Sequence, residues 1–322
     1  MIQDTYNRTI DYMRVSITDR CNLRCKYCMP DDIALIPHQE IMRYEEFLRL
    51  VRIFSKQGIS KIKVTGGEPL VRLRCVDFIR DLKQIEGIRS VTLTTNGVLL
   101  SEKLPELLAA GVDAINISLD TLKRERFAQI TGKDEFERVW RGIQEASAAG
   151  IKIKLNCVPI LEYNADEIPD FFELARKHPI DVRFIEMMPI GNGKKFQPVS
   201  TDEILRQLKD RYKDISEIQE VRGNGPAVYY SGKDFAACIG VIGAVHRQFC
   251  STCNRIRLTS EGFLKLCLYH KDGVDLKKLI REGAEDEVIA QTIREAILQK
   301  PKEHHFLAAD EGDRRNMSQI GG

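Results

Sequence analysis

The chain has 322 residues, of which 43% are hydrophobic and 30% charged, and its 49 basic and 47 acidic side chains leave a formal net charge of +2. This length allows a large core and more than one domain, whereas the balanced charge excludes bulk attraction to nucleic acid or anionic lipid. The first ten residues lack a secretion signal and no run of about 18 apolar residues could span a membrane, so we expect a cytoplasmic protein without nucleic-acid or membrane partners.

Short β-rich runs alternate with helical patterns over the first two-thirds of the chain. The predicted strands are 13–18, 61–65, 90–95, 114–119, 152–158 and 182–187, and the predicted helices include 44–57, 101–110, 136–149 and 165–177. Strand–helix alternation over this length predicts parallel βαβ units. Six strands are too few for a closed eight-fold barrel, so we expect an α/β fold with an incomplete barrel or an open sheet.

Polar or glycine-rich residues follow each predicted strand. They include Gly66, Gly67 and Glu68 after the second strand, Asn96 after the third, and Ser118 at the end of the fourth. In parallel barrels the active site is built at the carboxyl ends of the strands. The sequence therefore predicts a functional site at this rim.

The pattern changes after residue 188. A helix is predicted to start at Ser200, short strands and turns are expected over 221–268, helices near 275–281 and 285–299, and a polar tail without regular structure over 301–322. We therefore expect two domains, a partial barrel over 1–220 and a C-terminal domain over 221–322.

Nine cysteines are the most distinctive feature of the composition. They form two groups and three isolated residues: the first triplet, Cys21, Cys25 and Cys28; the second triplet, Cys250, Cys253 and Cys267; and Cys75, Cys157 and Cys238. Without a secretion signal, closely spaced cysteines indicate metal ligands before disulfides, and thiolates suit iron–sulfur clusters or zinc. Three cysteines on a four-iron cluster leave one iron open to a small molecule, although zinc with a fourth ligand from elsewhere is an alternative for either triplet. The isolated cysteines are expected to be small buried hydrophobes.

Two arginines lie between the cysteines of the second triplet. Alternation on a short strand puts Arg255 and Arg257 on one face. A solvated strand face is one explanation, but two guanidiniums beside an open iron suit the binding of an anionic substrate.

The first triplet, with Tyr27 as the aromatic residue of Cys-x3-Cys-x-aromatic-Cys, resembles the signature of the radical S-adenosylmethionine (SAM) superfamily. The Gly-Gly-Glu-Pro segment at 66–69 resembles the superfamily's second motif. The resemblance implies a four-iron cluster whose open iron is chelated by SAM, and a 5′-deoxyadenosyl radical that abstracts hydrogen from a substrate. The glycines would let the backbone approach a ligand, and Glu68 would face the SAM amino group.

The combined pattern resembles one family of that superfamily, the GTP 3′,8-cyclases of molybdenum cofactor biosynthesis. The shared features are both triplets, Asn-Arg-Ile-Arg at 254–257, Arg-Phe-Ile-Glu at 183–186 and the ending Ile-Gly-Gly. The resemblance implies an incomplete (β/α)6 parallel barrel with a second four-iron cluster in the C-terminal domain, whose open iron binds the purine of GTP. It also implies the first step of the pathway, in which the radical removes the C3′ hydrogen of GTP and the carbon radical attacks C8, giving (8S)-3′,8-cyclo-7,8-dihydroguanosine 5′-triphosphate.

The same resemblance assigns roles at the rim and on the strands. The residues expected to contact SAM are Tyr27, Gly67, Asn96, Ser118 and Met188. Those expected to bind GTP are Arg14, Lys63, Thr94, Lys154, Arg255, Ile256 and Arg257. The family more often has arginine at the position of Lys63, and a lysine keeps the charge but loses the bidentate fork.

Several features stay open at this level. Lys61 is expected on the same face as Lys63, and Arg183 is assigned no role, an ion pair with Glu186 being one possibility. The resemblance implies that the Gly-Gly end enters the active site, and that the partners are a second copy of the chain, an external electron donor and a downstream pyranopterin-forming enzyme. Two other function classes remain: a radical SAM maturase that acts on a peptide, and a non-enzymatic zinc-binding protein.

Overall fold

The computed structural model describes residues 1–321 apart from 31, 248, 308–311 and 314. Six parallel strands are consecutive neighbours in one curved sheet: β1 (Tyr12–Ser16), β2 (Lys61–Thr65), β3 (Ser90–Thr95), β4 (Ala114–Ser118), β5 (Ile153–Cys157) and β6 (Asp181–Ile185). The six predicted strands lie within two residues of these bounds. The expected α/β fold with a partial parallel barrel is confirmed.

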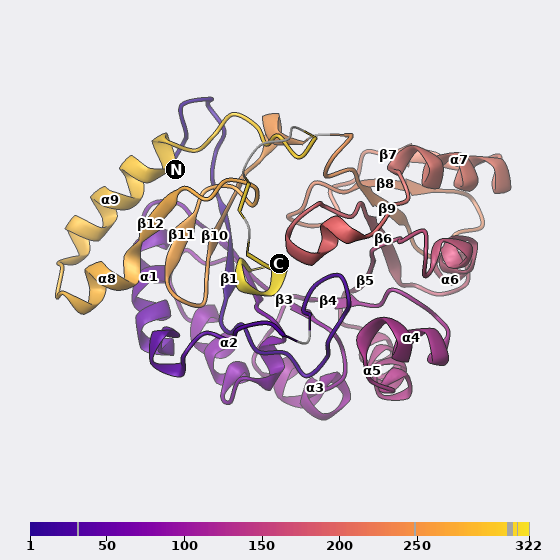
Figure 1. The fold of residues 1–322 in the computed structure, drawn as a ribbon, viewed down its shortest axis with the longest axis horizontal. Coiled ribbons are helices and arrows are strands. Elements are labelled where there is room, and N and C mark those ends of the chain that lie inside the picture. Colours follow the sequence, from indigo (N-terminus) through magenta and orange to yellow (C-terminus); the bar gives the residue numbers. More distant parts are fainter. Residues whose placement is uncertain (31, 248, 308–311, 314, 322) are drawn as a thin grey trace.

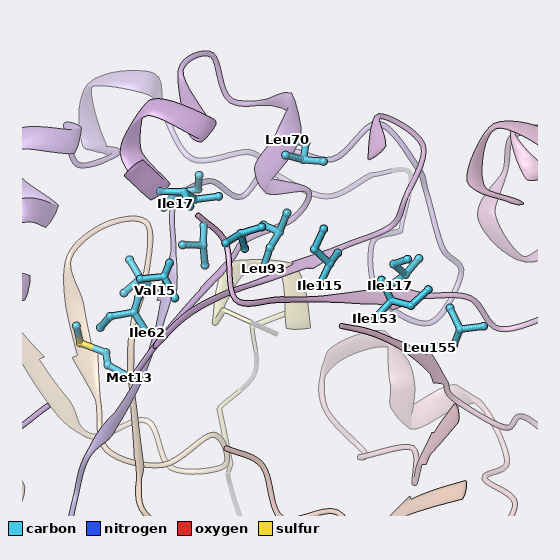
Figure 2. Packing of buried hydrophobic residues seen from close by; sticks show 14 of the residues in the cluster. Met13, Val15, Ile17, Ile62, Leu70, Leu93, Ile115, Ile117, Ile153 and Leu155 are labelled. Carbon is cyan, nitrogen blue, oxygen red and sulfur yellow. The ribbon is translucent and has the colours of Figure 1, made fainter. Parts of the chain in front are cut away.

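Six helices cover the outer side of this sheet (Figure 1): α1 (Tyr44–Lys56), α2 (Cys75–Lys83), α3 (Leu100–Ala109), α4 (Arg124–Thr131), α5 (Phe136–Ala148) and α6 (Ile168–Lys177). Alternate residues of each strand point outward and are apolar. Figure 2 shows Met13, Ile62, Leu93 and Ile115 packed together on this side, and each is fully buried. Burying such a side chain contributes about 1.5–3 kcal/mol, so the outward face holds the barrel together and leaves the inward face available for chemistry.

The C-terminal part of the chain extends the same sheet at both edges. On one side β10 (Arg255–Leu258) pairs parallel with β1, followed by β11 (Phe263–Lys265) and β12 (Gly273–Asp275). On the other, β9 (Ile239–Ile242) pairs parallel with β6, followed by β8 (Val228–Ser231) and β7 (Ser216–Ile218). The described chain thus has a 12-stranded sheet. The six predicted barrel strands form its centre, and the short strands expected over 221–268 are among those that extend it. The predicted boundary at residue 220 stays a prediction, since strands from both sides of it share the sheet.

Three further helices follow the barrel: α7 (Thr201–Arg211), α8 (Leu276–Arg281) and α9 (Asp286–Leu298). The predicted start of α7 is confirmed, because the Ser200 side chain accepts a hydrogen bond from the Glu203 N–H at 3.2 Å. Among the helices that the structure describes, none has the length and apolar run that crossing a bilayer requires.

The tail after α9 returns to the inner side of the sheet, where Figure 1 shows the C-terminus. Among its described residues the regular structure is one short 3-10 helix, Met317–Gln319, which agrees with the prediction of an irregular tail. Ile320 is fully buried. The tail is therefore part of the packed structure and reaches the face that carries the predicted site.

Candidate active site

Basic side chains line the inward face of the sheet. Arg14 on β1 is in register with Lys63 on β2 and with Arg257 on β10, and Tyr12, two residues earlier, is in register with Arg255. Residues in register on neighbouring strands point to the same side. Four of the predicted GTP-binding cations are therefore brought together on three adjacent strands.

The opposite side of this inward face carries two more cations. The Lys154 Nζ donates a hydrogen bond to the Tyr229 hydroxyl at 3.0 Å and lies 3.9 Å from the Asp181 carboxylate. The Arg183 guanidinium donates to the Asn156 Oδ1 at 2.9 Å and also to the Asn116 Oδ1. Both basic side chains are buried, and the neutral amides hold Arg183 without cancelling its charge.

These six cations, three of them buried and three partly buried, repel one another. Burial, followed by repulsion from Arg183, Arg14, Lys154 and Arg255, lowers the pKa of Lys63 well below its usual value. Burial, Arg14 and Arg255 lower the pKa of Arg257 to about 9, and burial and Arg183 lower that of Lys154 to about 7.

Few carboxylates offset this charge. Within the described residues, Lys63, Arg183, Arg255 and Arg257 form no ion pair with a carboxylate, and the buried Arg255 Nε has no hydrogen-bond acceptor. Clustered, desolvated cations are costly unless a partner neutralises them. The arrangement is suited to a ligand with several negative charges, such as a polyphosphate.

The structure also shows how three other residues near these cations are placed. Lys61 shares the face of Lys63, but its Nζ pairs with the Asp11 carboxylate at 2.6 Å. Arg183 does not pair with Glu186, whose carboxylate instead accepts hydrogen bonds from the backbone N–H of Val245 and contacts the His246 ring. Thr94 on β3 is in register with Asn116 and faces the same side as the cations.

Ile256 is the exception among the predicted GTP contacts. It is in register with the outward-facing Met13 and is fully buried in the core. Its side chain therefore points away from the cations, and only its backbone is available to a ligand on the inward face.

The loop with the first triplet follows β1 and lies against the segment after β2. The Gly67 N–H donates to the Thr18 carbonyl at 2.7 Å, and the Glu68 N–H donates to the Arg20 carbonyl at 2.8 Å. A Cβ at Gly66 would lie 2.6 Å from the Thr18 carbonyl oxygen, and one at Gly67 would lie 2.7 Å from that of Asp19. In this structure the glycines are needed so that the cysteine loop can approach β2.

The position of Glu68 corrects one prediction. Its carboxylate is fully buried and accepts hydrogen bonds from the Leu70 N–H at 2.9 Å, the Thr95 hydroxyl at 2.8 Å and the Asn96 N–H at 2.6 Å. Burial raises the pKa of Glu68 to about 7, and the three hydrogen bonds oppose that shift. Glu68 thus positions the rim instead of facing an amino group in an open site.

Asn96 connects that rim to the first triplet. Its Nδ2 donates to the Asn22 side chain at 2.8 Å and lies 3.6 Å from the Cys21 Sγ. The Cys21 Sγ also accepts the Leu23 N–H at 3.4 Å, and the backbone N–H of Ser318 in the tail is directed at the Cys28 thiol. Such N–H donors around sulfur are typical of iron–sulfur sites, whose potential they tune.

The remaining predicted SAM contacts lie around the same rim. Tyr27 donates its hydroxyl proton to the buried Asp120 carboxylate at 2.6 Å. Ser118 ends β4, and Met188 follows β6; both are partly exposed. Asp120, which directly follows the Ser-Leu pair at the end of β4, is among the polar residues predicted at the rim, although no role was predicted for it. Its role is to fix the aromatic residue of the cysteine loop.

The thiols of the first triplet are close enough to influence one another. Burial and the neighbouring Cys21 raise the pKa of Cys28 to about 12, and burial followed by Cys28 raises the pKa of Cys25 well above its usual value. Among the described residues, no three histidine, cysteine, aspartate or glutamate side chains converge tightly enough for a single ion. The fit to a metal cluster therefore rests on the three thiols and the N–H donors that surround them.

The second triplet lies at the opposite end of β1. Cys250 is in a 3-10 turn, Cys253 precedes β10, and Cys267 follows β11. Burial acts to raise the pKa of Cys253, but the cations Lys300 and Arg255 prevail and lower it. A thiol set with a stabilised thiolate and nearby cations fits an anionic metal cluster.

The tail contacts both the cations and the first loop. Arg257 donates to the Gly321 carbonyl at 2.9 Å, and Gly321 has a φ of 78° that favours glycine. Asp313 anchors the tail by pairing with the buried Lys265 and, at 2.7 Å, with Arg315. The expected entry of the chain end into the site is thus seen for Gly321, whereas Gly322 lies outside the described residues.

All nine cysteines are among the described residues, and none forms a disulfide. Cys75, Cys157 and Cys238 are buried at 3%, 1% and 5% exposure. Their prediction as small buried hydrophobes is confirmed.

Comparison with known proteins agrees with the two halves of this site. Residues 15–175 match the sequence model of the radical SAM superfamily, and residues 180–306 match that described as Molybdenum Cofactor Synthesis C. The chain is 45% identical over 323 residues to a GTP 3′,8-cyclase of Clostridium perfringens strain SM101, covering 100% of both chains, and 45% identical over 325 residues to that of Heliobacterium modesticaldum, covering 99% of each. Among solved structures, Streptococcus suis SuiB bound to S-adenosylmethionine shares the fold, with a TM-score of 0.65 at 14% identity over 92% of this chain and 73% of that one.

Proposed function

The chain belongs to the GTP 3′,8-cyclase family of radical SAM enzymes in molybdenum cofactor biosynthesis, and we propose that it cyclises GTP in a chamber flanked by two four-iron clusters. Membership of this family implies that the chain uses SAM and one four-iron cluster. The second cluster, the residues at each site and the partners are the parts that we infer from the geometry.

The first triplet is proposed to hold the SAM cluster. Cys21, Cys25 and Cys28 would supply three ligands, and the open iron would take SAM. The chemistry that the bound cluster and SAM supply is a one-electron cleavage that yields a 5′-deoxyadenosyl radical. The polypeptide contributes a rim that orients SAM, for which we propose Tyr27, Gly67, Asn96, Ser118 and Met188.

The second triplet and the inward cations are proposed to hold GTP. Cys250, Cys253 and Cys267 would leave an iron open to the purine. Arg14, Lys63, Thr94, Lys154, Arg255 and Arg257 would hold the triphosphate, with the backbone at Ile256. The observation that carries this proposal is the cluster of six buried or partly buried cations between two groups of three thiols. Such a cluster matches a polyanion placed between two metal centres.

The chain's own groups are arranged to bind and orient more than to transfer protons. The cations fix the phosphates, and Gly321 on Arg257 helps to close the inner side of the chamber. Holding the ribose and base in one orientation is what makes abstraction at C3′ and attack on C8 regioselective.

The test is anaerobic reconstitution followed by metal and product analysis. We expect about eight irons and eight sulfides per chain, from two four-iron clusters. With SAM, a reductant and GTP, 5′-deoxyadenosine and the cyclised nucleotide should form together. Cys267→Ala should keep reductive SAM cleavage and lose cyclisation, whereas the control Cys238→Ala, at an isolated buried thiol, should keep both. Cyclisation by the Cys267→Ala protein, or zinc without sulfide in the wild type, would overturn the proposal.

The partners follow from the same proposal. An external donor must supply the electron that cleaves SAM, and a downstream pyranopterin-forming enzyme must consume the product. We also propose a homodimer, by analogy with the family, and a cytoplasmic location, where thiols stay reduced for cluster assembly.

A further inference from the structure

Lys300 connects the two segments that flank Cys253 and Cys267 of the second triplet. It follows α9 and is only 3% exposed. Its Nζ donates to the Arg255 carbonyl at 2.9 Å, at the start of β10, and to the Leu266 carbonyl, directly before Cys267. One ammonium group therefore joins the backbone next to Cys253 to the backbone next to Cys267.

The charge of Lys300 lacks a conventional partner. Four lysines are buried in the described part of the chain: Lys154, Lys265, Lys277 and Lys300. The first three lie within ion-pair distance of Asp181, Asp313 and Glu40, respectively. Lys300 forms no ion pair with a carboxylate among the described residues.

Burial lowers the pKa of Lys300, and the negative groups that oppose this shift are the cysteines Cys253 and Cys267. Arg8 lies on the same side and donates to the Cys250 carbonyl at 2.8 Å, but it is already paired with Asp4 at 2.6 Å. A buried ammonium without a counter-charge is strongly destabilising. Negative charge on the second triplet would offset the free-energy cost of burying the Lys300 ammonium.

We propose that Lys300 is the counter-ion of the second cluster, holding its ligand strands in register and favouring the addition of an electron to it. This inference rests on the proposed second cluster. Three thiolates make such a cluster anionic, and one-electron reduction makes it more so. A fixed cation stabilises the reduced form more than the oxidised form, and the midpoint potential is then higher than it would be without that charge.

The test is a redox titration of the second cluster followed by electron paramagnetic resonance. The full-length protein would carry alanine at all three positions of the first triplet, so that one cluster remains, and dithionite would supply the electron. Lys300→Met removes the charge at similar length, Lys300→Arg keeps it, and Lys277→Met removes a buried lysine that pairs with Glu40 at 2.6 Å. We expect a more negative midpoint potential for Lys300→Met and an unchanged one for the other two variants.

The outcomes separate this inference from the function on which it rests. About four irons per wild-type chain, instead of about eight, would refute the second cluster itself. A second cluster whose potential is the same with methionine at position 300 would refute the role of Lys300 alone. If Lys300→Met fails to assemble the cluster, Lys300→Gln keeps one amide donor for a backbone carbonyl, and the same negative shift is expected there. An unshifted potential in Lys300→Gln would then overturn the inference.

Discussion

Lys154 should change its protonation when GTP enters the chamber. Burial and Arg183 lower its pKa from 10.5 to about 7, although Asp181 opposes the shift. At pH 8 the ammonium is then only about one-tenth populated in the empty chamber. A bound polyphosphate favours the charged form, and if the pKa returns to near 10.5, Lys154 takes up about 0.9 proton per GTP at pH 8 but only about 0.1 at pH 6.

Calorimetry of GTP binding in buffers of different ionisation enthalpy measures this uptake directly. The titration would use the cluster-loaded protein at pH 8, where the terminal phosphate of GTP, with a second pKa of about 6, is already ionised. Lys154→Met should lose about 0.9 proton of uptake. The control Lys209→Met removes an exposed lysine on α7 that does not act on Lys154, and it should match the wild type. Equal uptake in the Lys154→Met and wild-type proteins would refute the reasoning that this lysine is largely neutral before GTP binds.

Two further substitutions test the cations and the cysteine loop. Lys63→Met should raise the Kd for GTP about 10- to 150-fold, because a charged hydrogen bond contributes about 1.5–3 kcal/mol, while Lys63→Arg should bind at least as tightly; equilibrium dialysis measures both, and an unchanged Kd for Lys63→Met would exclude a phosphate contact. Gly67→Ala should lose about half of the iron per chain, since the new Cβ meets the carbonyls of Asp19 and Arg20. Gly225→Ala is the control because its Cβ would meet nothing within 4 Å. Full iron loading of Gly67→Ala would show that the loop with the first triplet can shift to accommodate the new Cβ.

The parts of the fold that local pattern determines could be predicted from the sequence. The predicted strands match β1 and β2 closely, and the expectation that Lys61 shares the face of Lys63 is met. Two helices, α2 and α4, were not among those named from the sequence. They have nine and eight residues, and so short a segment shows little helical periodicity.

Features that depend on distant partners could not be predicted in this way. The parallel pairing of β10 with β1 joins residues more than 240 positions apart in the chain, and a four-residue strand carries no local sign of its partner. The burial of Glu68 was missed for a similar reason, since its acceptor role depends on Thr95 and Asn96 on the next strand. Ile256, by contrast, could have been placed correctly, because the alternation that pairs Arg255 with Arg257 already assigns it to the core.

The register of β10 on β1 explains why one chain would need two triplets. Cys253 precedes Arg255, which is in register with the first residue of β1, and Cys21 comes after the last residue of that strand. At about 3.3 Å per residue, the ends of β1 are about 13 Å apart, so thiols at one end cannot complete the coordination of a metal at the other. In the proposed function each triplet would therefore form its own centre with three thiol ligands. Arg14, halfway along β1 and flanked by Lys63 and Arg257, faces the space between the two triplets. A nucleotide whose phosphates are held at mid-strand can reach one centre with its base while its ribose remains accessible from the other, which is the geometry that joining C3′ to C8 requires.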